Sequence, residues 1–85
     1  MIKATVTGRI WSTKKLREMP AGSILEVQIE GSSATMLAFD PLSCGIGEKV
    51  IIATGSVAAS WFPGKAPPID ALIIGLIDET LNLNA

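Results

Sequence analysis

Hydrophobic and polar residues alternate in two segments of the chain, residues 2–7 and residues 25–30. Alternation with a period of two, together with β-branched side chains, is typical of a strand with one buried face. We expect the first strand to continue as far as Trp11. After the second strand, a tight turn at residues 31–33 leads into a further strand over residues 34–39. These last two strands therefore predict an antiparallel hairpin.

The second half of the chain predicts three more elements. Asp40-Pro41 ends the strand before it, because proline donates no backbone hydrogen bond, and residues 49–54 predict the next strand. A short helix is expected over residues 57–61, with Ser56 as its N-cap. The tail, residues 81–84, alternates again and predicts a short edge strand.

Residues 71–77 form an uninterrupted apolar run between two acids, Asp70 and Asp78, with Gly75 inside it. The run is too short to cross a bilayer and too continuously apolar for a strand with one wet face, so it predicts a strand covered on both sides. A chain of this size buries only about 60% of its unfolded surface, yet 48% of its residues are hydrophobic. We therefore expect leftover apolar surface that a second copy of the chain covers.

Five or six short strands with one small helix predict a closed or nearly closed antiparallel barrel, which makes the fold class all-β. A glycine inside the last long strand fits a barrel corner or a close neighbouring backbone. The tail strand is a candidate for pairing with a neighbouring subunit. The length of 85 residues predicts a single domain, residues 1–85.

Charge and composition narrow the class of partner. The formal net charge is −1, which argues against a partner held mainly through phosphate contacts. Bases gather in the first 20 residues and acids in the last 20, so the two ends of the chain can attract each other within one subunit or across two, but solvated loops are the favoured interpretation. Cys44 is the only cysteine, and the uncharged stretch over residues 50–64 contains two glycines and a proline. With no apolar signal segment at the start, we expect a soluble cytoplasmic protein without a disulfide or a membrane span.

Residues suited to catalysis or metal binding are scarce. The chain has no histidine, which removes the commonest general base and the commonest metal ligand together. Cys44 has no histidine to activate it and is interpreted as a small buried thiol. Three aspartates, at 40, 70 and 78, stand at strand ends, where aspartate commonly caps a turn or binds a backbone amide. We therefore predict no catalytic residue, no cofactor and no metal ion.

The glycines at positions 45 and 47 lack the strand, loop and helix context of a nucleotide-binding fingerprint, so they are interpreted as turn residues. Small five-stranded barrels often bind single-stranded nucleic acid, and Trp11 near Lys14, Lys15 and Arg17 is the best cluster for that function here. Packing of Trp11 at a strand end or subunit contact is the favoured interpretation. Nucleic-acid binding remains the alternative.

Three blocks of sequence, residues 8–14, 40–58 and 68–78, are informative as an ordered set. The first contains Trp-Ser-Thr-Lys, the second contains Gly-Ile-Gly-Glu and later Gly-Ser-Val-Ala, and the third is Pro-Ile-Asp-Ala-Leu-Ile-Ile-Gly-Leu-Ile-Asp. In these blocks the chain resembles the EutN/CcmL family, the pentameric vertex proteins of bacterial microcompartment shells. The resemblance implies a small five-stranded barrel of the oligonucleotide-binding type, with one short helix and a C-terminal edge strand.

The resemblance also implies a function: a homopentamer that caps the vertices of a microcompartment shell and contacts hexameric shell proteins. Residues at which the resemblance and the turn chemistry predict the subunit interface are Gly45, Gly47, Ser56, Asp70, Gly75 and Asp78. The basic loop with Lys14, Lys15 and Arg17 is the predicted contact with neighbouring shell proteins.

The chain departs from the family pattern at a few positions. It has Ala59 and Ser60 where a base is often found, so an ion pair from there to Asp70 cannot form. Lys49 also stands where an aromatic residue is frequent. These departures affect the expected interface contacts and not the expected fold.

Overall fold

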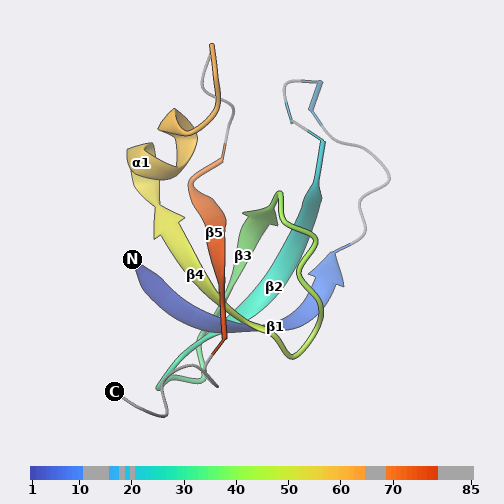
Figure 1. Ribbon diagram of the computed structural model, residues 1–85, viewed down its shortest axis with the longest axis vertical. Coiled ribbons are helices and arrows are strands. Elements are labelled where there is room, and N and C mark those ends of the chain that lie inside the picture. The colour runs from blue at the N-terminus through green and yellow to red at the C-terminus, as the bar shows by residue number, and fades with distance from the viewer. Residues whose placement is uncertain (11–15, 18, 20, 65–68, 79–85) are drawn as a thin grey trace.

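The computed structural model of this chain describes residues 1–10, 16–17, 19, 21–64 and 69–78. Within these residues the chain forms a closed five-stranded barrel with one short helix, as predicted (Figure 1). The elements in chain order are β1 (Ile2–Ile10), β2 (Ser23–Ile29), β3 (Thr35–Asp40), β4 (Lys49–Thr54), α1 (Gly55–Ser60) and β5 (Ala71–Ile77). Around the barrel the order is β1-β2-β3-β5-β4.

The expectation of a purely antiparallel barrel is wrong at one seam. β3 and β5 pair in parallel, with Phe39 opposite Leu72, while the other four strand pairs are antiparallel. The reason is parity, because a closed ring of five strands cannot alternate direction at every step. The fifth strand must therefore run the same way as one of its neighbours, and β5 does so against β3.

Two irregularities bend the sheet into this closed shape. The β1–β2 register shifts between Val6 and Gly8, and the β4–β5 register shifts so that Ile52 faces Ile73 while Ile51 faces Gly75. Extra residues of this kind increase local twist and help a small sheet to close. The predicted extension of the first strand to Trp11 lies outside the described residues, since β1 is described as far as Ile10.

Two apolar clusters hold the subunit together. The larger fills the barrel and has members from all five strands, with Val27, Val50 and Ile52 fully buried at its centre. A smaller cluster lies outside the barrel beside the helix and contains Phe39, Ala58, Ile69 and Leu72, with Met19 and Phe62 packed against it. The helix therefore covers the β3–β5 seam at one end of β5.

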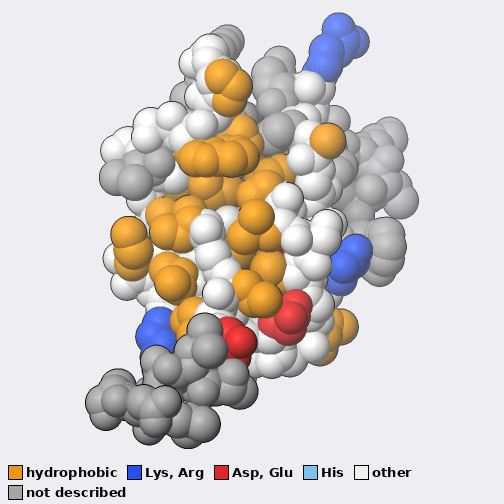
Figure 2. Space-filling model, in the orientation of Figure 1, with side chains coloured by type: hydrophobic (Ala, Val, Ile, Leu, Met, Phe, Trp, Pro, Cys, Tyr) orange, Lys and Arg blue, Asp and Glu red, His pale blue; other side chains and the backbone are white. Residues whose placement is uncertain are grey.

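The prediction that the apolar run is covered on both sides holds for only part of β5 within one subunit. Ala71, Leu72 and Ile73 are buried, but Ile74 is 42% exposed and Leu76 is 51% exposed. Figure 2 shows hydrophobic side chains gathered down the face on which β5 lies in Figure 1. The second half of β5 is therefore apolar and uncovered.

The helix begins earlier than expected. α1 starts at Gly55, so the predicted N-cap, Ser56, lies inside the helix and is exposed; the capping role was wrong. The backbone N–H of Gly55 donates to the carbonyl oxygen of Asp70 at 2.7 Å, which ties the start of the helix to the start of β5. The predicted edge strand over residues 81–84 lies outside the described residues. In the described part of the chain, no helix is both long and apolar enough to span a membrane.

Candidate functional site

The most distinctive surface of the subunit is an apolar face made by the second half of β5 and the two segments beside it. Its exposed members are Leu42, Trp61, Ile74 and Leu76, which are 42–59% exposed. A groove of about 190 Å³ runs along it, lined by Pro41, Leu42, Trp61, Leu72, Ile73 and Ile74. We call these four exposed side chains and their groove the apolar face (Figure 2).

Asp40 holds Leu42 in position on the apolar face. The Asp40 side chain is buried, at 2% exposure, and its carboxylate accepts hydrogen bonds from the backbone N–H groups of Leu42 at 2.8 Å and Cys44 at 2.7 Å. This is the turn-capping role that the sequence predicts for an aspartate at a strand end. Charge-assisted bonds of this kind are stronger than neutral ones, so the turn after β3 is firmly fixed.

The same carboxylate influences Cys44, which is buried and 4% exposed. Burial first, and then the negative charge of Asp40, raise the pKa of the Cys44 thiol to about 11. A thiol with such a pKa stays protonated at neutral pH, and the thiol is not the nucleophilic form. The interpretation of Cys44 as a small buried thiol is therefore confirmed.

The loop between β3 and β4 is braced at both ends of its Gly-Ile-Gly tip. The N–H of Gly45 donates to the carboxylate of Glu48, and the N–H of Gly47 donates to the carbonyl oxygen of Val6 at 2.8 Å. Gly47 has a φ of 92°, a conformation that favours glycine. This confirms that Gly45 and Gly47 are turn residues, and it leaves Ile46 between them 71% exposed.

Trp61 is fixed against the second apolar cluster by a chain of aromatic contacts. Its ring meets Phe62 edge to face, with centroids 4.8 Å apart, and Phe62 meets Phe39 in the same manner at 5.7 Å. Edge-to-face pairs of this kind stabilise a defined geometry. Trp61 is therefore a positioned aromatic side chain, although it is 59% exposed.

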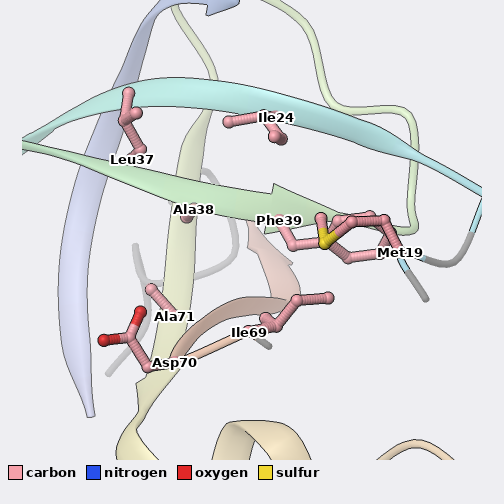
Figure 3. Close-up of a pocket in the computed structure, with 8 residues that line it drawn as sticks. All are labelled: Met19, Ile24, Leu37, Ala38, Phe39, Ile69, Asp70 and Ala71. Carbon is pink, nitrogen blue, oxygen red and sulfur yellow. The ribbon is translucent and has the colours of Figure 1, made fainter. Parts of the chain in front are cut away.

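A second apolar hollow lies between β2, β3 and the start of β5. It has a volume of about 140 Å³ and is lined by Met19, Ile24, Leu37, Ala38, Phe39, Ile69, Asp70 and Ala71. In Figure 3, Met19 and Phe39 lie together at one side, whereas the Asp70 carboxylate points away from them. Leu37, which is 53% exposed, stands at its edge on β3. We call this hollow the Leu37 pocket.

The structure brings three of the predicted interface residues to the last strand and places the others elsewhere. Asp70 and Asp78 are exposed at the two ends of β5, with half-buried Gly75 between them. A side chain at Gly75 would have room within the subunit, since an added Cβ would lie 3.9 Å from Ile51 Cδ1. Among the described residues no backbone therefore crowds this glycine, which lies at the register shift between β4 and β5.

The remaining predicted residues are spread over the molecule. Gly45 and Gly47 are in the loop before β4, and Ser56 is on α1. Arg17 is exposed, whereas Lys14 and Lys15 lie outside the described residues.

The sequence did not single out the large apolar residues of the two surfaces. These residues are Leu37, Leu42, Trp61 and Ile74. Their signal was the surplus of hydrophobic residues, which does not say where on the surface they gather.

Side chains that bind metal ions are scattered in the described part of the chain. No cluster of three or more histidine, cysteine, aspartate or glutamate side chains is placed to hold a metal ion there. Both hollows are lined mainly by hydrocarbon. Such linings are suited to contact with other apolar surfaces.

A closed barrel that exposes two apolar surfaces is typical of one class of protein, namely the subunit of a larger assembly. The chain belongs to the EutN/CcmL family: the family model described as "Ethanolamine utilisation protein EutN/carboxysome" matches residues 1–78. It is 30% identical over 84 residues to the bacterial microcompartment shell vertex protein PduN of Salmonella typhimurium, an alignment that covers 88% of this chain and 92% of that protein.

Solved structures agree with this assignment. The pentameric shell protein MSM0273 from the RMM microcompartment is 60% identical, with a TM-score of 0.88 over 91% of this chain and all of that one. EutN from Escherichia coli is 28% identical, with a TM-score of 0.81 over 92% of this chain and 85% of that one. The family resemblance deduced from the three sequence blocks is thus confirmed.

Proposed function

We propose that this protein forms a homopentameric ring that caps the vertices of a bacterial microcompartment shell in the cytoplasm. The observation that carries the proposal is the uncovered apolar face on a chain that is 60% identical to a pentameric shell protein along nearly its whole length. Monomers seldom expose large contiguous apolar patches. A ring of identical copies covers such a face at every subunit at once.

The role follows from geometry. A layer of six-fold tiles stays flat, and a five-fold tile in place of a six-fold one forces the layer to curve and close. Such a piece needs a defined shape and complementary edges but no reactive group, so we propose that the protein is not an enzyme. Native mass spectrometry of the full chain tests the ring directly, with five copies of the 8.9 kDa subunit as the expected species and a monomer as the refuting one.

We further propose that the ring contacts hexameric shell proteins through the basic loop that contains Lys14, Lys15 and Arg17. Arg17 is exposed, which supports its availability to a neighbour. Reversing the three charges to glutamate is expected to impair closure of shells co-expressed with the hexameric proteins, while the pentamer remains intact by mass. Unaltered shell closure would contradict this contact.

The predicted interface residues remain proposals. Asp70, Gly75 and Asp78 lie along the strand that carries the apolar face, and this position supports a contact with the next subunit. Gly45 and Gly47 would contribute through the shape of their loop, and Ser56 through its exposed position on α1. Alanine or valine at each position, followed by mass measurement of the assembly, separates interface residues from bystanders.

Binding of single-stranded nucleic acid is not favoured, since the net charge is −1 and the two described hollows are apolar. A fluorescence-anisotropy titration with short labelled single strands at low and moderate salt examines it. Salt-sensitive binding would revive this alternative.

A further inference from the structure

The segment from Gly55 to Gly64, which consists of α1 and the turn after it, is weakly anchored to the barrel. Figure 1 shows α1 beyond the end of β4, beside the start of β5. Among the described side chains of this segment, Ala58 is buried and Phe62 is half-buried, while the others are exposed. A segment with so few buried apolar contacts opens at a lower free energy than the core of its domain. We call residues 55–64 the flap.

The flap has a glycine at each end that suits a hinge. Gly55 has a φ of 70° and Gly64 has a φ of 75°, and a Cβ added at either would lie in open space. Residues that absorb backbone rotation during loop motion are often small ones at the ends of elements. Rotation at these two positions is therefore less restricted than at residues that carry a side chain.

Phe62 makes the main contact that keeps the flap closed. Its ring meets the buried Phe39 ring edge to face, with centroids 5.7 Å apart, in the cluster that also contains Ala58. Ala58 buries little area because its side chain is a single methyl group. Since the free energy of apolar burial scales with area, release of Phe62 from Phe39 is the main cost of opening the flap.

Opening of the flap changes the apolar face. Trp61 belongs to the flap, whereas Leu42 and Ile74, which line the same groove, belong to the loop after β3 and to β5. Rotation at the two glycines carries Trp61 away from these partners. It also uncovers Leu72, which is buried in the cluster beside α1. The groove is therefore complete only while the flap is closed.

We propose that the flap opens while the barrel stays folded, with Phe62 as its latch, and that opening dismantles the groove of about 190 Å³ on the apolar face. The inference concerns one subunit and does not depend on the proposed pentamer. A partner that binds the complete groove binds the closed form, so it shifts the population toward the closed flap. The flap thus makes the apolar face switchable.

Thiol labelling of the full chain tests the flap. Ala58→Cys places a thiol at the buried position of the flap, and native Cys44, buried in the barrel cluster, reports on the barrel in the same molecule. Leu72→Cys gives a second buried thiol that is smaller than the side chain it replaces. Ser56→Cys is the matched control for an exposed position on α1. Iodoacetamide labelling is followed by peptide mass spectrometry, and circular dichroism reports whether each variant is folded.

The thiols at positions 58 and 72 are expected to react more slowly than the one at position 56, yet at least about tenfold faster than Cys44. Adding Phe62→Ala is expected to speed labelling at both positions about tenfold, because the latch is removed. Adding Met36→Ala instead removes a side chain packed on the barrel cluster. This change should lower the urea midpoint and leave the rate at position 58 unchanged, because a flap that opens alone does not break that contact.

The opposite results would overturn the proposal. Equal rates at position 58 and Cys44, or faster labelling at position 58 with Met36→Ala, would show that the flap opens only together with the barrel. A rate at position 58 as high as at position 56 would show that the flap is not closed. An unchanged rate with Phe62→Ala would exclude Phe62 as the latch. Native mass spectrometry of the same samples is independent, since a wild-type monomer would refute the pentamer and leave these rates to decide on the flap.

Discussion

Replacing Asp40 is expected to weaken the subunit more than replacing any exposed carboxylate. The carboxylate is almost fully buried and accepts two backbone hydrogen bonds, from Leu42 and Cys44. Asp40→Ala leaves both N–H groups without their acceptor. A buried unsatisfied donor costs about 1–3 kcal/mol, and because the Leu42 contact is only partly buried, the total is expected at about 3 kcal/mol.

Asp40→Asn separates charge from shape. The amide retains one acceptor oxygen but turns an NH₂ group toward the second backbone N–H, so a loss of about 2 kcal/mol is expected. The matched control is Glu30→Gln, which makes the same chemical change at an exposed residue paired with Lys3 at 3.3 Å and Lys49 at 4.0 Å. Exposed ion pairs contribute at most about 1 kcal/mol, so this variant should stay close to wild type.

Urea unfolding followed by tryptophan fluorescence measures these differences, with all variants at one protein concentration because assembly couples to folding. The expected order of stability is wild type, then Glu30→Gln, then Asp40→Asn, then Asp40→Ala. If Asp40→Asn unfolds within about 0.5 kcal/mol of wild type, the range of neutral surface changes, the buried carboxylate does not hold the turn after β3.

Three further changes probe the subunit. Gly22→Ala is expected to cost at least about 2 kcal/mol in urea unfolding, because the new Cβ would overlap the buried Phe39 ring; near-wild-type stability would show that the ring moves aside. Cys44 is expected to resist iodoacetamide at pH 8 until urea is added. Because burial raises the pKa of the Cys44 thiol from 9.0 to about 11 on folding, stability should fall between these pH values by at most about 1.4 kcal/mol per pH unit, and Cys44→Ala should remove this dependence. Gly47→Ala, at a φ of 92°, is expected to lower stability by about 1–2 kcal/mol, and an unchanged urea midpoint would contradict the strain.

Strands with one wet face were predictable from the residues alone. In β1 and β2 the inward positions are apolar and the outward ones are mostly polar, so the period of two is visible in the sequence. The direction of the β3–β5 pair was not visible, because alternation along one strand carries no information about its neighbour. The parity of a closed five-strand ring would have predicted it.

Side-chain roles were predictable where they depend on nearby residues. Asp40 bonds groups two and four residues further along the chain, so its turn-capping role follows from its place at a strand end. The roles of Trp61 and Leu37 were not predictable in this way, because the hollows that they line are built from segments far apart in the sequence. Ser56 was misplaced because helix ends shift by one or two residues with little change in local sequence signals.

The closed circuit of strands has a consequence for how such subunits diverge. Since β1 to β5 pair around the barrel and only the β3–β5 seam is short, with Phe39 opposite Leu72, the described strands offer a neighbour little free edge along which to extend the sheet. Recognition between copies then falls to side chains, which mutation can change one at a time without disturbing the backbone pairing. Related shells in one cell could thus evolve vertices that reject each other's subunits while keeping a common architecture.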